Sequence, residues 1–284
     1  MGRTVAFVLG GGGVLGAVEV GMIRALYDAG IYPDLVVGTS IGALNGVVLA
    51  AAPIDEATDR LTELWSSSAA RDVFRASMAR QVGQLVRTGT HAHSSGPLRA
   101  LLKPLEGLRF EDLRVPFQCC AASIERAAER WFTSGPLIDA VMASCAVPGL
   151  LPPVRIEDEH YLDGGLVNSI PVGRALELGA DQVFVLQVGR IERPLRAPSK
   201  PWEVAMVAFE IARRHRFARD MASLPDNTDV HVLPTGLGEP IETKADRALT
   251  DLSPLAYRSF GLIDRRIDRA YQASTAYLAE NGLA

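Results

Sequence analysis

The pattern of hydrophobic and polar positions over the first thirty residues predicts a strand, a tight turn and a helix. Residues 4–9 are a β-rich apolar run, which consecutive glycines at 10–13 interrupt. Residues 16–29 then carry apolar side chains at helical spacing, and Gly30 follows them as a helix stop.

A second unit of the same kind follows directly. Residues 35–37 form a short apolar strand, and residues 38–42 form a turn with glycine at both ends. Residues 43–52 are so uniformly apolar that they indicate a buried helix, which Pro53 ends. Two successive strand–turn–helix units favour a parallel sheet covered by helices.

The middle of the chain changes character twice. Residues 55–103 are more polar and mostly helical in pattern, and we interpret them as a helical insertion over the sheet that lies near the site as a candidate lid. Strand patterns return at residues 117–123 and 131–133. A short helix is expected over residues 137–144, and an apolar stretch at 161–163 runs into two glycines.

Alternation of strand and helix patterns resumes in the last third of the chain. Pro171 can open a helix that Gly179 closes, and residues 182–188 have the pattern of a buried strand. The proline-rich residues 191–201 are the best linker candidate. Beyond them the pattern predicts a helix over 202–224, a strand over 229–233 and a helix over 254–279.

These elements predict one domain of the α/β class over residues 1–284. We expect a three-layer α/β/α arrangement with a mostly parallel central sheet, whose core covers about residues 4–190. Residues 201–284 would form a helical C-terminal extension that includes one strand.

Composition excludes several classes of protein. The chain has 284 residues, of which 48% are hydrophobic and 22% charged, so disorder, collagen and coiled coil are poor descriptions. With 29 Lys and Arg against 33 Asp and Glu, the net charge is −4, whereas a general nucleic-acid binder is normally basic. We therefore expect no nucleic-acid partner.

Cysteine usage and the N-terminus bear on the compartment. Cys119, Cys120 and Cys145 have no metal-binding spacing and are interpreted as buried thiols in a reducing compartment. The apolar run at residues 5–9 is too short for a signal peptide, and no run of about 18 apolar residues occurs. We expect a cytoplasmic protein, with peripheral contact to a membrane left open.

Three glycine-containing motifs carry the candidate chemistry. The first runs from Gly10 to Gly16, where consecutive glycines can aim several N–H groups at one small space at the positive end of a helix. Such a space suits an anion, and the alternative is a tight turn that packs the helix against the strand.

The second motif is a G-x-S-x-G built from Gly38, Ser40 and Gly42, between a short strand and a helix. That context is required of a nucleophile elbow, although a serine that caps a buried helix is the alternative. The third motif is Asp163 followed by Gly164 and Gly165, which by itself is a common turn. It gains weight only in combination with the other two.

Together the motifs resemble the patatin-like phospholipase family, which has a glycine-rich oxyanion loop, a G-x-S-x-G and a D-G-[GA] in this order and uses a Ser-Asp dyad. Residues 139–153 and 166–171 are also similar to that family, and the resemblance covers roughly residues 4–188. It implies a patatin-like fold, with Ser40 as nucleophile and Asp163 as general base, and it implies neither a cofactor nor a metal. The other implied site residues are Gly11, Gly12 and Gly13 of the oxyanion hole and the supporting Gly38, Ile41, Gly42, Gly164 and Gly165.

The activity that the resemblance implies is serine-dependent hydrolysis of lipid acyl esters through an acyl-enzyme, on phospholipids, lysophospholipids or related lipids. Because the reference pKa of an aspartate is about 4, Asp163 needs a partly dry pocket to act as a base. The family usually has a basic residue where this chain has Leu15, so the step from acyl ester to phospholipid is weaker than the catalytic inference.

Two other functions stay open. A catalytically silent member of the family would bind lipid or a protein partner. Gly11, Gly13 and Gly16 also satisfy the dinucleotide fingerprint of an oxidoreductase, but Asp34 stands before the second strand rather than at its end, where the ribose is held.

The histidines and one basic helix are weaker candidate sites. No histidine has the signature of a Ser-His-Asp triad, and His91 with His93 would be a weak metal pair. The predicted helix at 202–224 could dock on an anionic membrane, but packing on its own domain is the favoured interpretation. Its basic and aromatic residues are Arg213, Arg214, Arg216, Arg219, Phe209 and Phe217.

Overall fold

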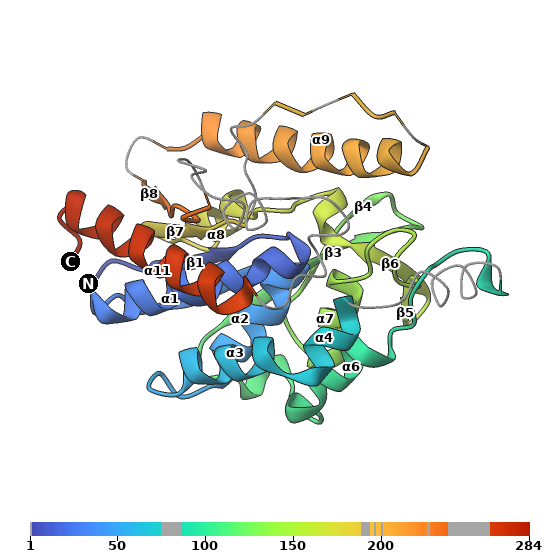
Figure 1. Cartoon of the computed structure of the whole chain (residues 1–284), viewed down its shortest axis with the longest axis horizontal. Helices are drawn as coiled ribbons and strands as arrows, with labels where there is room; N and C mark the ends of the chain where they lie inside the picture. The colour runs from blue at the N-terminus through green and yellow to red at the C-terminus, as the bar shows by residue number, and fades with distance from the viewer. Residues whose placement is uncertain are drawn as a thin grey trace.

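A mostly parallel sheet lies between two layers of helices in the computed structural model of the chain (Figure 1). The structure describes residues 2–74, 87–188, 194–195, 197–199, 201–225, 228–237 and 262–284. The predicted three-layer α/β/α class is therefore confirmed.

The described part of the sheet has the strand order β5-β6-β3-β2-β1-β7-β8, and β4 pairs with β3 outside this path. Neighbours from β3 to β8 along this order are parallel, whereas β4 and β6 run antiparallel to β3, and β5 runs antiparallel to β6. The strands are β1 (Val5–Leu9), β2 (Leu35–Thr39), β3 (Phe117–Ser123), β4 (Ala128–Phe132), β5 (Val154–Ile156), β6 (Glu159–Asp163), β7 (Gln182–Leu186) and β8 (Asp229–Val232).

Side chains of β1 show how the layers form, because successive residues of a strand point to opposite faces. Phe7 and Leu9 pack into the hydrophobic cluster that α1, α2, α3, α7 and α11 cover. Ala6 and Val8 pack into the second cluster, with α8 and with Phe217 of α9. The described α-helices are α1 (Ala17–Asp28), α2 (Ile41–Ala51), α3 (Ala57–Ser66), α4 (Ser68–Phe74), α6 (Gly96–Leu102), α7 (Leu137–Ser144), α8 (Val172–Glu177), α9 (Pro201–Ala222) and α11 (Ile263–Glu280).

Most expected elements have the expected type. The helix predicted over residues 137–144 is α7, and the strand predicted over residues 35–37 extends to Thr39 as β2. The described 3-10 helices are η1 (Gly13–Gly16), η2 (Lys103–Leu105), η3 (Phe110–Asp112) and η4 (Gly164–Leu166). The sequence pattern missed the β5–β6 hairpin, of which it marked only residues 161–163, because the charged residues around its turn mask the alternation.

The segment at residues 55–103 belongs in part to the core. Leu61 and Trp65 of α3 are buried in the cluster that also contains α1 and α2. Residues 75–86 of the segment lie outside the described residues, so the expected lid stays a prediction. Much of the predicted linker at 191–201 and the start of the last predicted helix, residues 254–261, also lie outside them.

The C-terminal extension packs against the sheet and against one of the two helix layers. β8 extends the sheet beside β7, and α11 lies along α1, so that segments more than two hundred residues apart in sequence lie side by side (Figure 1). Gly21 of α1 makes the close approach possible, since a Cβ on it would lie 2.1 Å from the carbonyl oxygen of Ile267.

The three cysteines are buried free thiols, as the sequence analysis expects. None of the described helices is both long enough and apolar enough to cross a lipid bilayer.

Candidate active site

The candidate site forms where two strands, β2 and β6, meet end to end along one edge of β3. β4 occupies one edge of β3 along residues 119–123. On the opposite edge of β3, β2 pairs with residues 117–120 and β6 pairs with residues 121–123, so β2 and β6 lie end to end. β2 ends with Thr39 opposite Cys120, and β6 ends with Asp163 opposite the next residue, Ala121. Because β6 is antiparallel to β3 and β2 is parallel to it, the carboxyl ends of β2 and β6 meet.

Ser40 and Asp163 are in direct contact at this meeting point. The hydroxyl of Ser40 donates a hydrogen bond to Oδ2 of Asp163 over 2.5 Å. The other carboxylate oxygen, Oδ1, accepts from the N–H of Gly165 over 2.7 Å. Asp163 is fully buried and Ser40 is 8% exposed, so the pair lies in a nearly dry environment.

Burial dominates the electrostatics of Asp163. Removal from water raises the pKa of its carboxyl to about 7, against the opposing effect of the hydrogen bonds from Ser40 and Gly165. A carboxylate with this pKa can take up a proton near neutral pH and give it back, which a carboxylate at its ordinary pKa does poorly.

Ser40 has the strained backbone of an elbow. Its φ of 57° and ψ of −126° lie outside the regions that side-chain-bearing residues favour. The flanking glycines allow this turn to pack closely, since a Cβ on Gly42 would lie 2.3 Å from the carbonyl oxygen of Leu9, and one on Gly38 would lie 2.5 Å from that of Gly42. Ile41 follows as the first residue of α2 and is buried.

Two residues of the α7 region, neither of which was predicted as a site residue, hold this turn in place. The hydroxyl of Ser144 accepts a hydrogen bond of 2.9 Å from the N–H of Ser40. The thiol of Cys145 donates to the carbonyl of Ser40 over 3.0 Å. Both residues lie within the 139–153 segment, whose resemblance to the family was the only sequence signal for them.

The glycine loop after β1 passes beside Ser40. A Cβ on Gly11 would lie 3.2 Å from Cβ of Ser40. The N–H of Gly11 donates to the carbonyl of Ser169 over 3.0 Å, so it is already engaged. Within the described chain no hydrogen bond engages the amides of Gly12 and Gly13, which leaves these two of the three predicted oxyanion donors available.

The glycines after Asp163 both lie in close contact with neighbouring elements. A Cβ on Gly164 would lie 2.3 Å from the carbonyl oxygen of Cys120, and one on Gly165 would lie 2.5 Å from Cζ of Phe209 in α9. The first contact keeps the end of β6 against β3. The second brings α9 over the turn that holds Asp163.

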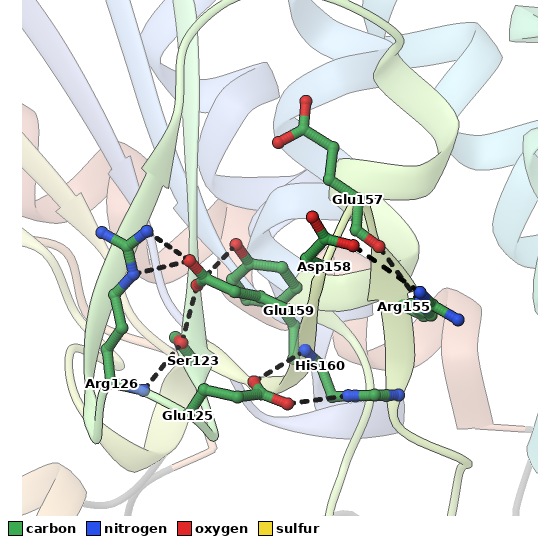
Figure 2. Close-up of polar contacts among 9 residues, drawn as sticks. Ser123, Glu125, Arg126, Arg155, Glu157, Asp158, Glu159 and His160 are labelled. Atoms are coloured by element: carbon green, nitrogen blue, oxygen red, sulfur yellow. Dashed lines mark hydrogen bonds and ion pairs between the residues drawn. The ribbon is translucent and has the colours of Figure 1, made fainter.

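The start of β6 is anchored by a polar cluster on the β5–β6 hairpin (Figure 2). Glu159 accepts hydrogen bonds from Ser123 over 2.8 Å and from Tyr161 over 3.0 Å, and it pairs with Arg126. Nδ1 of His160 lies 2.7 Å from a carboxylate oxygen of Glu125 (Figure 2). These contacts tie the hairpin to the end of β3 and so set the path of β6 toward Asp163.

The histidines take no part in the contacts of Ser40 and Asp163. His160 is half exposed and engages Glu125, and His231 stacks on Phe184 in the sheet. In the part of the chain that the structure describes, no histidine hydrogen-bonds to the hydroxyl of Ser40 or the carboxylate of Asp163. Nor do the described residues include a group of three or more His, Cys, Asp or Glu that could hold a metal ion.

Asp34, the acidic residue considered for a dinucleotide, lies at the wrong end of its strand. It precedes β2 and accepts a hydrogen bond of 2.8 Å from the N–H of Val5, at the first residue of β1. The glycine loop follows the last residue of β1, so Asp34 is separated from it by the length of a strand. This arrangement does not fit a ribose held beside the loop.

Comparison with known proteins gives one family and several relatives. The family model for patatin-like phospholipase matches residues 7–176. Lysophospholipase nte1 of Emericella nidulans is 34% identical over 199 residues, and a patatin-like phospholipase domain-containing protein of Caenorhabditis elegans is 36% identical over 198 residues. Each match covers 67% of this chain but only 12% and 14% of the respective relative, so the chain spans a small part of their length.

A solved structure is similar in fold. The structure of VipD from Legionella pneumophila matches with a TM-score of 0.50 and 16% sequence identity, and the match covers 98% of this chain and 67% of VipD. At this identity the likeness concerns the arrangement of the chain alone.

Proposed function

This chain belongs to the patatin-like phospholipase family, and from that premise we propose that it hydrolyses the carboxylic esters of lipids, with Ser40 as nucleophile and Asp163 as general base. The single observation that carries the proposal is the 2.5 Å hydrogen bond between the Ser40 hydroxyl and the buried Asp163 carboxylate. A nucleophile in contact with a base of raised pKa is the arrangement that acyl transfer requires.

The proposed reaction has two steps. Ser40 Oγ attacks the ester carbonyl carbon while its proton moves to Oδ2 of Asp163. The bond to the leaving alcohol then breaks, and the alcohol oxygen takes that proton. Water attacks the acyl-enzyme in the second step, gives a proton to Asp163 and releases the fatty acid, after which the proton returns to Ser40 Oγ.

Backbone amides would stabilise the negative oxygen that forms in both steps. The amides of Gly12 and Gly13 are the donors we assign to it, because the amide of Gly11 is engaged by Ser169. Gly11 then contributes the close approach of the loop to Ser40 rather than a free donor. Loss of one such donor typically lowers turnover by about a hundred- to thousandfold.

A labelling and turnover experiment tests the proposal. The chain would be treated with a fluorophosphonate probe and assayed on p-nitrophenyl esters, lysophospholipid, phospholipid and monoacylglycerol. We expect the probe mass on Ser40 in the wild type, no labelling or turnover in Ser40→Ala, and a loss of roughly a hundred- to ten-thousandfold in kcat for Asp163→Asn. Ser66→Ala, which removes an exposed serine outside the site, is the matched control and should behave as the wild type.

Two results would contradict the proposal in different ways. Full turnover by Asp163→Asn would remove the dyad while leaving Ser40 in place. Absence of labelling and turnover on every lipid would favour the catalytically silent, lipid-binding or partner-binding alternative. Peripheral membrane contact and a cytoplasmic location remain further parts of the proposal, to be tested by sedimentation with vesicles and by fractionation.

A further inference from the structure

Arg213 of α9 is a buried cation with an unused donor. Its side chain is 4% exposed. Nε donates a hydrogen bond of 3.1 Å to the hydroxyl of Ser169, and Nη1 pairs with Glu210, one turn earlier, at 3.2 Å. Nη2 is also buried, and no described group accepts a hydrogen bond from it.

The position of Arg213 relates it to the candidate site. Ser169 Oγ, which accepts from Arg213, and Ser40 Cβ each lie 3.2 Å from the point that a Cβ on Gly11 would occupy. Ser169 Oγ is therefore within twice that distance of the Ser40 side chain. On the other side, Phe209 lies one turn before Arg213 and contacts Gly165, which binds the carboxylate of Asp163. α9 thus places Arg213 on Ser169, which lies beside Ser40, and places Phe209 against the turn that holds Asp163.

The carboxylate that Arg213 contacts is shared, and one donor of Arg213 has no described acceptor. Glu210 pairs with Arg213 at 3.2 Å and also with Arg214 at 3.3 Å, so it does not serve Arg213 alone. A buried N–H without an acceptor is costly, and native structures seldom leave one in place without a role. A guanidinium is suited to a phosphate oxygen because its planar set of donors matches that group.

We propose that Arg213 binds the phosphate of a phospholipid or lysophospholipid whose acyl ester lies on Ser40, and so makes the enzyme prefer phosphate-bearing lipids over neutral ones. This proposal rests on the proposed function and deepens it. In a glycerophospholipid the phosphate and the acyl ester are carried by one three-carbon unit, so the two groups are held close together. The glycine loop from Gly10 to Gly16 carries no cation of its own, which leaves Arg213 as the phosphate ligand we assign.

The test compares two substrates that share an acyl chain and differ in the phosphate. Arg213→Met should lower kcat/KM for a lysophosphatidylglycerol roughly ten- to hundredfold, the range for losing a hydrogen bond to a charged group, and should change kcat/KM for the matching monoacylglycerol less than about twofold. Arg213→Lys should recover part of the loss because it keeps the charge without the planar donors. Arg219→Met, an exposed arginine of the same helix, is the control and should change neither value.

A binding measurement covers the case in which Arg213→Met fails to fold, and it does not need turnover. Ser40→Ala should bind lysophosphatidylglycerol in calorimetry more tightly than the monoacylglycerol. The preference should shrink when Arg213→Lys is added. If the wild type turns over no ester while this preference is present, the proposed function fails and the assignment of Arg213 stands.

Three results would overturn the assignment. An equal loss on both substrates in a folded Arg213→Met would make Arg213 a clamp that holds α9 on Ser169. Equal affinity of Ser40→Ala for the two lipids would exclude a phosphate contact. Inhibition of the wild type by inorganic phosphate that matches inhibition by glycerol phosphate and by the lysophospholipid headgroup would indicate a site for free phosphate instead.

Discussion

At the scale of single residues, the proposed dyad of Ser40 and Asp163 depends on the environment of Asp163 more than on its identity. The hydrogen bonds from Ser40 and Gly165 lower its pKa, yet burial outweighs them and the pKa rises to about 7. The same carboxyl in water would be almost fully ionised at neutral pH and a weak base. The buried end of β6 therefore changes what this aspartate can do.

The raised pKa of Asp163 predicts opposite effects of pH on activity and on stability. As a base Asp163 must be ionised, so kcat/KM for a neutral ester should rise with pH to a plateau, with a midpoint at about 7. The folded state holds the proton more tightly than the unfolded state, so the free energy of unfolding should fall as pH rises from about 4 to 7, by up to about 4 kcal/mol.

Urea unfolding at a series of pH values would measure this effect. Glu19 is also buried, and burial raises its pKa. It therefore also makes the free energy of unfolding fall as pH rises. Asp163→Asn is therefore the control, because it removes only the contribution of Asp163. If Asp163→Asn and the wild type have the same slope between pH 4 and 7, the raised pKa is wrong.

The strained backbone of Ser40 predicts that glycine at this position gives a more stable protein than alanine does. Ser40→Gly and Ser40→Ala both lose the hydroxyl, but glycine adopts a φ of 57° more readily than alanine does. We expect Ser40→Gly to be more stable than Ser40→Ala by about 1 kcal/mol, although glycine normally destabilises a folded chain relative to alanine, with both variants inactive. Thermal melts at one pH would decide it, and a more stable alanine variant would mean that the turn is unstrained.

At the scale of elements, the site depends on the register of three strands. Asp163 reaches Ser40 because β2 and β6 end opposite neighbouring residues of β3, Cys120 and Ala121. A shift of β6 by one residue would turn the Asp163 side chain to the other face of the sheet. The polar contacts of Glu159 at the start of β6 therefore matter for the site, although they lie at the far end of the strand (Figure 2).

The close packing of α1 on α11 predicts a large effect of a small side chain. Gly21→Ala would place a methyl group 2.1 Å from the carbonyl oxygen of Ile267, so the two helices would have to separate. We expect a loss of stability of roughly 1–3 kcal/mol, as for other overpacked positions. In α6, Gly96→Ala has free space for the methyl group and should leave stability unchanged or raise it slightly, which makes it the control for the substitution itself. Equal melting temperatures for the two variants would contradict the close packing.

At the scale of the whole molecule, the described strands belong to one sheet. β8, from the C-terminal extension, pairs with β7, and β7 pairs with β1. α11 buries Ile267 and Leu278 in the same cluster as the first strand. The extension therefore contributes to the main core, and the single domain over residues 1–284 stays a prediction.

A single domain should unfold in one cooperative step. Near-ultraviolet circular dichroism, far-ultraviolet circular dichroism and loss of esterase activity should follow the same urea curve. Separate transitions, with activity lost while most of the helical signal remains, would mean that the extension folds independently of the core. Gly21→Ala should move all three curves together, because its clash lies between the extension and the core.

Apolar periodicity along the chain was enough to predict the fold class, and the resemblance of three motifs to the patatin-like phospholipase family implied the pair of residues that come into contact. These features are local. A glycine run, a serine between glycines and an aspartate before glycines restrict the backbone wherever they occur, and apolar periodicity identifies the elements around them.

Only the tertiary structure decided which groups surround that pair, which hydrogen bonds they make and how far the pKa of Asp163 is raised. Ser144 and Cys145 hold the elbow, Ser169 engages the amide of Gly11, and Arg213 arrives from a helix some 170 residues beyond Ser40. Contacts of this kind, and the burial that raises the pKa of Asp163, depend on how distant segments pack. Packing is a property of the assembled core and is absent from any local stretch of sequence.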